Sequence, residues 1–327
     1  MSLNIKEGFE LLDSGNSKES LLKYREKGAL RGCFLGFPIL HEKYTMSLPG
    51  ATEWTGIPSS GKTEFLLELL LNTSLYYGWK HLLYVPDVGT KDQILGILIH
   101  KITGKTFDKR YVNSNYISEQ EVEKELDFVY HHFKILHKKN PKAKLTPFEF
   151  WDMAVELNKN TDGGIQTATI DSWKDMKRYC GQNGESITRD DLYLEDVLNY
   201  RNTLSELHKM HFHIVIHPLK TEFDKDGKRK APTPYELKGG PTWYDMGKVQ
   251  VTVHRTDGSP NEVNIIITKA KPESVASVGS VKMYFDKKTR KFYWDYNGVD
   301  TYAKKEYFKP TGIAISEQFD DDDGIPF

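Results

Sequence analysis

Eight consecutive residues constrain this chain more than any others, because from Gly56 to Thr63 they read Gly-Ile-Pro-Ser-Ser-Gly-Lys-Thr. This order fits G-x-x-x-x-G-K-[ST], the pattern of a phosphate-binding loop. Such a loop works because its backbone N–H groups and the N-terminus of the next helix converge on an anion. We expect phosphate groups to contact the whole loop: Gly56, Ile57, Pro58, Ser59, Ser60, Gly61, Lys62 and Thr63.

Two side chains of the loop have separate expected roles. Lys62 would reach the β- and γ-phosphates of a nucleotide, and the Thr63 hydroxyl would coordinate Mg²⁺. Trp54 and Thr55 before the loop suit a strand, and the leucine-rich run after it contains no Gly or Pro before Gly78. The sequence therefore predicts a strand, the loop and a buried helix in the order that this motif requires.

Two acidic residues follow short apolar runs downstream of the loop. The run from Lys80 to Val85 precedes Asp87, and the β-branched run from Ile165 to Ile170 ends at Asp171. Active groups of parallel α/β sheets cluster at the carboxyl ends of the strands. An aspartate in that place suits a water-mediated contact with Mg²⁺. We therefore predict a metal site formed by Thr63 and Asp171.

The last third of the chain is richer in strands than in helices. Alternating or β-branched runs at 249–255, 262–269 and 280–285 lead through a turn to a hairpin partner at 291–294. Strands and helices alternate before them, interrupted by a polar insertion from Gly104 to Leu126. This order predicts an α/β fold, with a mainly parallel sheet flanked by helices and an antiparallel β extension.

Composition limits the compartment and the partners. No run is long and apolar enough to span a bilayer, the N-terminus lacks the apolar core of a signal peptide, and Cys33 and Cys180 have no metal-ligand spacing. We expect a cytoplasmic protein of a bacterium or a phage-infected cell, without a membrane partner. The net charge is −1, and the last eleven residues contribute five acids and no base. The remaining excess of four positive charges is compatible with nucleic-acid binding.

Taken in order, the motifs resemble the RecA-fold motor of hexameric replicative DNA helicases, of the phage and mitochondrial Twinkle-like kind and of the DnaB kind. The resemblance extends from about Leu30 to Trp294 and does not depend on the phosphate-binding loop alone. It rests on Gly56–Thr63, Tyr84–Asp87, Thr169–Trp173, Ile214–Lys220, Gly239–Tyr244, Thr268–Lys271 and Ser280–Trp294.

The resemblance implies a motor that hydrolyses ATP with Mg²⁺ at the subunit interfaces of a hexameric ring, translocates on single-stranded DNA and unwinds duplex. In such a motor Asp87 would polarise the attacking water, and His217 would sense the γ-phosphate, although a histidine of the core is the simpler alternative. Lys269 and Lys271 would act on the ATP of the neighbouring subunit. The implied catalytic residues are Lys62, Asp87, His217 and Lys271, and Lys269 is an implied nucleotide ligand.

Two residues depart from the pattern of the family. Asp87 is one methylene shorter than the expected glutamate, so its carboxylate would have to lie closer to the water. Lys271 stands where the family has an arginine finger, and its ammonium lacks the planar two-donor fork of arginine. We expect weaker activation between subunits, or activation by another residue, for which Arg255 is a candidate.

Loops that follow the predicted strands supply the candidates for DNA contact. Basic side chains that follow phosphates, together with an aromatic ring that stacks on bases, are usual in sites for single strands. For each basic residue, a solvated surface charge is the alternative. The candidates are Lys220, Lys228, Arg229, Lys238, Gly239, Gly240 and Trp243.

The sequence closes with four aspartates, Asp320 to Asp323, followed by Gly-Ile-Pro-Phe. This segment resembles the C-terminal tip of bacterial single-stranded-DNA-binding proteins, which implies that it docks replication proteins. The expected contacts are Asp322, Asp323, Ile325, Pro326 and Phe327. Two alternatives stay open: a solubilising tail, and a segment that competes with DNA in the channel of the molecule itself.

We expect three parts: an N-terminal helical docking segment at 1–29, the motor domain at 30–300, and a C-terminal extension with the acidic tail at 301–327. The helix predicted near residues 17–27 has too few apolar residues for a core of its own. It must therefore pack on its own domain or on a neighbouring subunit.

Two functions other than that of a helicase also fit the sequence. The first is a RecA-fold, DNA-dependent ATPase that does not unwind, such as a recombinase or a loader. The second is a replication scaffold whose ATP site only controls assembly. The departures at Asp87 and Lys271 keep the scaffold open, because both affect the expected rate of hydrolysis.

Overall fold

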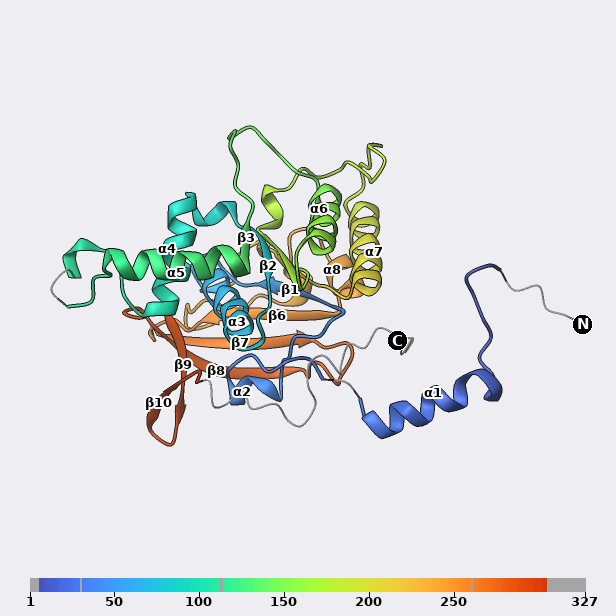
Figure 1. The fold of residues 1–327 in the computed structure, drawn as a ribbon, viewed down its shortest axis with the longest axis horizontal. Helices are drawn as coiled ribbons and strands as arrows, with labels where there is room; N and C mark the ends of the chain where they lie inside the picture. The colour runs from blue at the N-terminus through green and yellow to red at the C-terminus, as the bar shows by residue number, and fades with distance from the viewer. Residues whose placement is uncertain (1–5, 30, 112–113, 260, 305–327) are drawn as a thin grey trace, which may run out of the picture. The chain divides into compact units, whose positions relative to one another are not determined.

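The protein is represented by a computed structural model that describes residues 6–29, 31–111, 114–259 and 261–304 (Figure 1). Helix α1 (Ser14–Lys27) belongs to one compact unit, and the body that begins at Gly32 is another. A helix was expected near residues 17–27, and α1 confirms it, whereas its docking stays a prediction. The candidate docking residues at 322–327 lie outside the described residues.

Within the described residues of the body, ten strands form one sheet (Figure 1). Their order across the sheet is β10-β9-β8-β7-β6-β1-β5-β4-β2-β3. In chain order they are β1 (Gly50–Thr55), β2 (His81–Tyr84), β3 (Phe133–Ile135), β4 (Thr167–Asp171), β5 (His211–Val215), β6 (Val249–Arg255), β7 (Glu262–Lys269), β8 (Gly279–Asp286), β9 (Lys291–Tyr296) and β10 (Val299–Tyr302).

The sheet has a parallel part and an antiparallel part, as the sequence predicts. Strands β6, β1, β5, β4, β2 and β3 are parallel to one another. Strands β7 to β10 continue the sheet in antiparallel pairs. Because β1 lies between β5 and β6, the phosphate-binding loop leaves the sheet among the carboxyl ends of the parallel strands.

Helices cover the two faces of the sheet (Figure 1). Helices α3 (Lys62–Tyr77), α4 (Lys91–Thr103) and α5 (Glu119–His132) share one hydrophobic core, and α6 (Pro147–Asn160), α7 (Asp190–His208) and α8 (Thr242–Met246) share the other. The short helix α2 (Pro38–His41) contributes Leu40 to the first core. Successive strand residues point to opposite faces, so Leu83 lies in the first core and Leu82 in the second.

Local sequence signals explain where several helices begin. Thr146 accepts the backbone N–H of Glu149, whose side chain returns to the backbone of Thr146, so the predicted capping box of α6 is confirmed. Helix α5 was not expected, because its sequence was assigned to a polar insertion. Ser118 and Glu121 form a capping box there, and the buried Val129 anchors the helix to the core.

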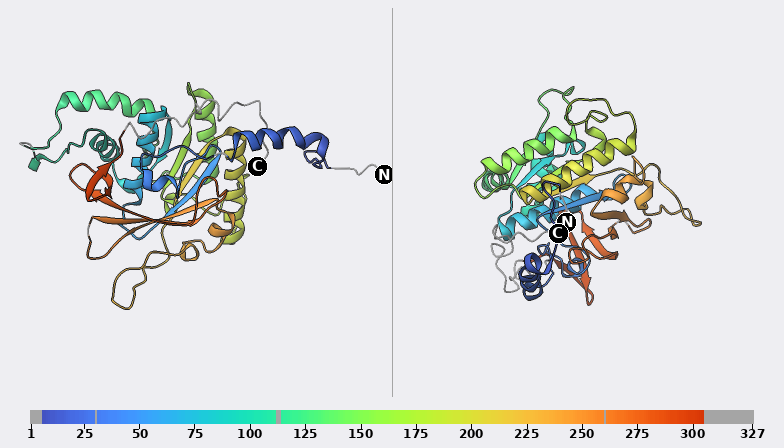
Figure 2. Two further views of the ribbon diagram at one scale, coloured as in Figure 1. Left: turned by 90° about the horizontal axis from the view of Figure 1, so that it is seen from below. Right: turned by 90° about the vertical axis from the view of Figure 1, so that its right-hand side faces the viewer.

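Buried ions fix helix α3, which carries the phosphate-binding loop, to the antiparallel end of the sheet. The ammonium of Lys101 in α4 lies 3.2 Å from carboxylate oxygens of both Glu64 and Glu68 in α3. It also donates to the carbonyl of Arg290, over 2.5 Å. Figures 1 and 2 show the loop between β8 and β9 at the same end of the body as α4 and α5. The position of α3 is therefore determined from both sides.

Candidate nucleotide-binding and catalytic site

The phosphate-binding loop contains glycines where a side chain would not fit. At Gly56 the backbone φ is 148°, and a Cβ atom would lie 2.2 Å from the carbonyl oxygen of Val253. At Gly61 φ is 97°, and helix α3 begins at the next residue. Both conformations strain an L side chain. The loop thus has the tight turn and the exposed helix N-terminus that anion binding requires.

Lys62 and Thr63 lie at the mouth of this loop. The Lys62 ammonium donates to the carbonyl oxygens of Gly56 and Ile57, at 2.8 and 2.9 Å. The Thr63 hydroxyl donates to Oδ2 of Asp171 over 2.5 Å. The hydroxyl and the carboxylate are hard oxygen donors side by side, which fits the ligand preference of Mg²⁺.

Burial changes the protonation of this group. It raises the pKa of Asp171 to about 6, although the Thr63 hydrogen bond and the Lys62 charge oppose the shift. It lowers the pKa of Lys62 to about 8, against the attraction of Asp171 and Asp87. A buried carboxylate that resists ionisation gains most from a divalent cation beside it. The donor set therefore fits Mg²⁺ in charge as well as in chemistry.

Asp87 lies in the short turn after β2 and is the centre of a polar cluster. Its Oδ2 is 2.9 Å from the ammonium of Lys174 and accepts the Ser172 hydroxyl at 3.0 Å. Nε2 of His217 lies 3.5 Å from the same oxygen. Burial alone would raise the pKa of Asp87, but the contacts with Lys174 and Ser172 outweigh it, and the pKa is lowered.

His217 follows β5 and lies between the two sides of the site. Burial, followed by repulsion from Lys62, lowers its pKa, although the Asp87 contact opposes the shift. The neutral imidazole is therefore favoured, and it can donate from one ring nitrogen and accept at the other. Nδ1 is buried and has no hydrogen-bond partner among the described residues. A neutral histidine near the phosphates suits hydrogen bonding rather than charge pairing.

One cavity of about 730 Å³ contains these groups. A triphosphate requires an elongated polar site, and five segments of the body supply this one. Its lining consists of Pro58, Ser59, Gly61, Lys62, Thr63, Glu64, Asp87, Asp171, Lys174, His217, Pro218, Leu219, Lys238 and Arg255. The structure thus places the loop, both predicted acids and the predicted histidine around one space, and it adds Lys174 and Glu64, to which no sequence motif pointed.

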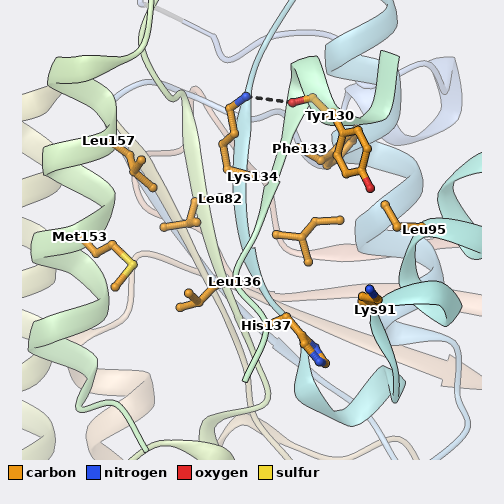
Figure 3. A pocket seen from close by; sticks show the side chains of 11 residues that line it. Leu82, Lys91, Leu95, Tyr130, Phe133, Lys134, Leu136, His137, Met153 and Leu157 are labelled. Carbon is orange, nitrogen blue, oxygen red and sulfur yellow. Dashed lines mark hydrogen bonds between the residues drawn. The ribbon is translucent and has the colours of Figure 1, made fainter. Parts of the chain in front are cut away.

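A second cavity, of about 530 Å³, lies beside the edge strand β3 (Figure 3). Met153 and Leu157 of α6 face it from one side and Leu95 of α4 from the other. Lys134 of β3 donates to the backbone carbonyl of Tyr130 at 2.8 Å. Among the described residues, no carboxylate and no part of the phosphate-binding loop lines this cavity, so we do not assign the nucleotide to it.

The three cations discussed for contact between subunits are placed differently. Lys269 is only 6% exposed, and its ammonium donates to the backbone carbonyls of Tyr244 and Asp245 of its own subunit. The expectation that Lys269 binds a neighbouring nucleotide is therefore wrong for this structure, because the ammonium stabilises α8. Lys271 is exposed. Arg255 lines the cavity of its own subunit, beside Gly61.

The basic candidates for DNA contact lie on exposed or half-buried loops. Lys228 and Lys238 are exposed, and Lys238 also lines the nucleotide cavity. Lys220 is exposed and pairs with Glu222 at 2.8 Å. Arg229 is half-buried and pairs with Asp257 through its guanidinium and its backbone N–H. Lys228 and Lys238 are thus the more accessible cations of the set.

Trp243 cannot stack on a base in this structure, because its side chain is fully buried. Its indole N–H donates to the carbonyl of Lys238 at 3.1 Å, and its ring packs edge-on against Trp173 with centroids 5.1 Å apart. Gly239 adopts a φ of 115°, and a Cβ atom there would meet Leu194 and Trp243 at 2.8 Å. Gly240, with φ of 84°, completes the turn. Trp243 therefore supports the loop from below, and the stacking role was wrong.

The sequence is similar to the Twinkle homolog protein, chloroplastic/mitochondrial, of Arabidopsis thaliana, with 23% identity over 272 residues. The match covers 81% of this chain and 37% of that protein, so the chain spans little more than a third of the relative's length. No family model matches the sequence.

Two solved structures have a similar fold. One is a helicase ATPase domain, which superposes with a TM-score of 0.66 and 16% identity, over 86% of this chain and 99% of that domain. The fold is that of RecA-like helicase ATPase domains. A DnaB-like replicative helicase, solved in a study of its interactions with primase, also gives a TM-score of 0.66 and 16% identity, over 87% of this chain and 67% of its own. In the described part of the chain, no helix has the length and apolarity to cross a membrane.

Proposed function

We propose that this protein is an ATP-dependent replicative DNA helicase motor that works as a ring of identical subunits, most simply a hexamer. The observation that carries the proposal is the 730 Å³ cavity, in which the loop, two acids, a histidine and a lysine meet at the ends of parallel strands. The sequence similarity to the Twinkle homolog and the fold shared with helicase ATPase domains support the same function.

Mg²⁺-ATP is the expected ligand of the cavity. The Thr63 hydroxyl and, through water, the Asp171 carboxylate would hold the metal ion, which neutralises charge on the phosphates when bound. The N–H groups of the loop and the Lys62 ammonium would hold the β- and γ-phosphates, after Lys62 exchanges its two carbonyl partners for phosphate oxygens.

Asp87 would orient the attacking water and accept its proton. Its carboxylate is at the correct end of β2 for this role, and its lowered pKa keeps it ionised at neutral pH. His217, 3.5 Å from that carboxylate, would sense the γ-phosphate. The chain continues from His217 into the loop that carries Lys220 and Lys228, so the state of the nucleotide can reach the proposed DNA surface.

Single-stranded DNA would contact Lys220, Lys228, Arg229, Lys238, Gly239 and Gly240. Lysines bind phosphates without reading the sequence, which suits a motor that moves along any strand. The segment from Asp322 to Phe327 would dock replication proteins, and the exposed Lys271 would face a neighbouring subunit. These contacts are part of the proposal.

The decisive experiment is a Lys62→Ala substitution. We expect DNA-stimulated ATP hydrolysis and strand displacement on a forked duplex to fall at least about a hundredfold, because the lysine stabilises charge that develops on the phosphates. Lys159→Ala, an exposed lysine at the end of α6 outside the cavity, is the matched control and should retain full activity. Hydrolysis that survives Lys62→Ala would end the proposal.

A second candidate, a DNA-dependent ATPase that does not unwind, is favoured by the burial of Lys269. Coordinated firing around a ring needs cations that cross the interface, and one of the two candidates is bound to its own subunit. Hydrolysis stimulated by single-stranded DNA, without displacement of the forked duplex, would select this candidate. A protein that binds ATP without turnover would instead be the scaffold.

A further inference from the structure

Lys174 is a cation in the catalytic cavity to which neither the loop motif nor the family pattern gave a role. It lies in the turn Trp173–Asp175, directly after β4, and its ammonium is 2.9 Å from Oδ2 of Asp87. Its side chain is 48% exposed, so the ammonium can change partners without leaving a packed core. It lines the same cavity as Lys62 and His217.

The turn that carries Lys174 is rigid, whereas the tip of the side chain is not. Trp173 is buried and packs edge-on against Trp243. The Ser172 hydroxyl can donate to Asp175 at 3.1 Å or to Asp87 at 3.0 Å, which joins the two ends of the turn. The Cα of Lys174 is therefore fixed, while its four-carbon stem allows the ammonium to reach more than one oxygen.

The cations expected from a neighbouring subunit do not meet this need equally. Lys269 is bound to the backbone of α8 in its own subunit, and Lys271 has the ammonium of a lysine where a guanidinium is expected. Lys174 already lies beside the catalytic aspartate of its own subunit. A positive charge close to the γ-phosphate is the component that Lys62 alone does not provide.

We propose that Lys174 stabilises the transferring phosphate within its own subunit, by moving from Asp87 to the γ-phosphate when ATP enters the cavity. This inference rests on the proposed ATPase function. The exchange frees Asp87 at the same moment, because one ammonium cannot hold both anions at its closest distance. A diphosphate has no γ-phosphate, so with ADP the pair between Lys174 and Asp87 would persist.

The chemical step balances with the groups present. The oxygen of water forms a bond to the γ-phosphorus, and the bond from that phosphorus to the β,γ-bridging oxygen breaks. ADP leaves with the electron pair, and the proton of the water passes to Asp87. Lys174 remains protonated throughout and stabilises the negative charge on the equatorial oxygens.

Mixing two inactive variants tests whether Lys174 acts within one subunit or across an interface. Lys174→Ala should lower kcat about a hundredfold, and Lys62→Ala disables the loop. If Lys174 served the neighbour, a mixed assembly would contain some sites with an intact loop and an intact Lys174, and activity would return. We expect no return above the sum of the separate variants. Restored hydrolysis in the mixture would overturn the inference.

Nucleotide binding gives a readout that a merely structural role would not change. Lys174→Ala should bind fluorescent ADP within about twofold of the wild type, but lose about tenfold in affinity for a non-hydrolysable ATP analogue, because the γ-phosphate contact alone is missing. Lys174→Arg should recover part of that loss. Lys177→Ala, an exposed lysine of the same segment outside the cavity, is the control, and thermal unfolding checks that all variants fold.

The outcomes for the two proposals are separable. A wild-type protein without ATP hydrolysis would end the proposed function and this inference with it. An active wild-type protein whose kcat is unchanged by Lys174→Ala would end only the inference. Equal losses of ADP and ATP affinity in Lys174→Ala would also contradict it, because that pattern indicates a structural defect.

Discussion

The hydroxyl of Thr63 donates to Oδ2 of Asp171 over 2.5 Å, and this bond joins the first turn of helix α3 to the end of strand β4. The two residues are 108 positions apart in the chain. Both oxygens belong to the proposed Mg²⁺ site. Because burial raises the pKa of Asp171 to about 6, metal binding and proton binding compete for one carboxylate.

We therefore expect the affinity for Mg²⁺-nucleotide to fall as the pH decreases through 6. At pH 5 about one tenth of the Asp171 side chains would be ionised, so the affinity should be about tenfold lower than at pH 7.5. Titration calorimetry at several pH values measures this. Asp171→Asn should bind weakly and lose that part of the pH dependence, whereas the protonation of the nucleotide itself affects both proteins alike.

Stability should show the opposite dependence when Mg²⁺ and nucleotide are absent. The folded pKa of Asp171 lies above the ordinary value of 3.8, so between about pH 4 and pH 6 the folded state binds more protons than the unfolded state. The free energy of unfolding from this group then decreases as the pH rises through that window. Urea unfolding at pH 4.5 and 7 measures the change. A difference between these values as large in Asp171→Asn as in the wild type would contradict the assignment.

Asp87→Asn tests the proposed general base. The amide keeps the size of the side chain but cannot accept a proton from water, so kcat should fall about a hundredfold or more. Binding of the ATP analogue should change by less than about threefold, because Asp87 does not contact the phosphates in the proposed arrangement. Ser172→Ala removes one hydrogen bond to Asp87 and should reduce kcat only severalfold. A large loss of nucleotide affinity in Asp87→Asn would place Asp87 among the binding residues instead.

Trp243 and Lys238 should separate packing from DNA binding. Trp243→Phe removes a buried indole and its hydrogen bond to Lys238, so the free energy of unfolding should fall by about 1–3 kcal/mol. The affinity for oligo-dT should remain within about twofold. Lys238→Ala should weaken DNA binding and reduce the salt dependence by about one ion. The reverse pattern, with Trp243→Phe impairing DNA binding in a stable protein, would restore the stacking role.

Lys101→Met tests the buried ions beneath helix α3. The variant leaves Glu68, a buried carboxylate, without its ammonium partner, and such losses typically cost about 3–5 kcal/mol. We expect a lower urea midpoint and weaker nucleotide binding, because the loop loses its support. Lys101→Met combined with Glu68→Gln should recover part of the stability, since no charge is then left unpaired. Equal losses in the single and the double variant would show that the pair is not coupled.

The sequence predicted elements that depend on short-range signals. The loop motif, the apolar runs of β2 and β4, and the capping box at Thr146 each fix local structure within a few residues. Helix α5 escaped prediction because its polar sequence conceals a single buried stripe that contains Val129. The signal that could have found it was the capping box of Ser118 and Glu121, the same pattern that was recognised at Thr146.

The site was less predictable than the fold, because chemistry depends on which loops meet. Lys174 follows Asp171 by three residues, yet its contact with Asp87 exists only because β2 and β4 are adjacent in the sheet. Trp243 shows the reverse error: an aromatic residue in a glycine loop suggests an exposed ring, but the turn at Gly239 directs the indole inward. Sequence pattern alone does not distinguish these two environments.

Glu68 of helix α3 accepts the backbone N–H of Phe292 in β9 with both carboxylate oxygens, at 3.0 and 2.9 Å. These residues stand 224 positions apart, and the bond is buried. A tilt of α3 that leaves β9 behind would strip a charged acceptor of its donor in a place that water does not reach. The phosphate-gripping helix and the final hairpin must therefore travel as one rigid piece, so each turnover would rock the far rim of the sheet.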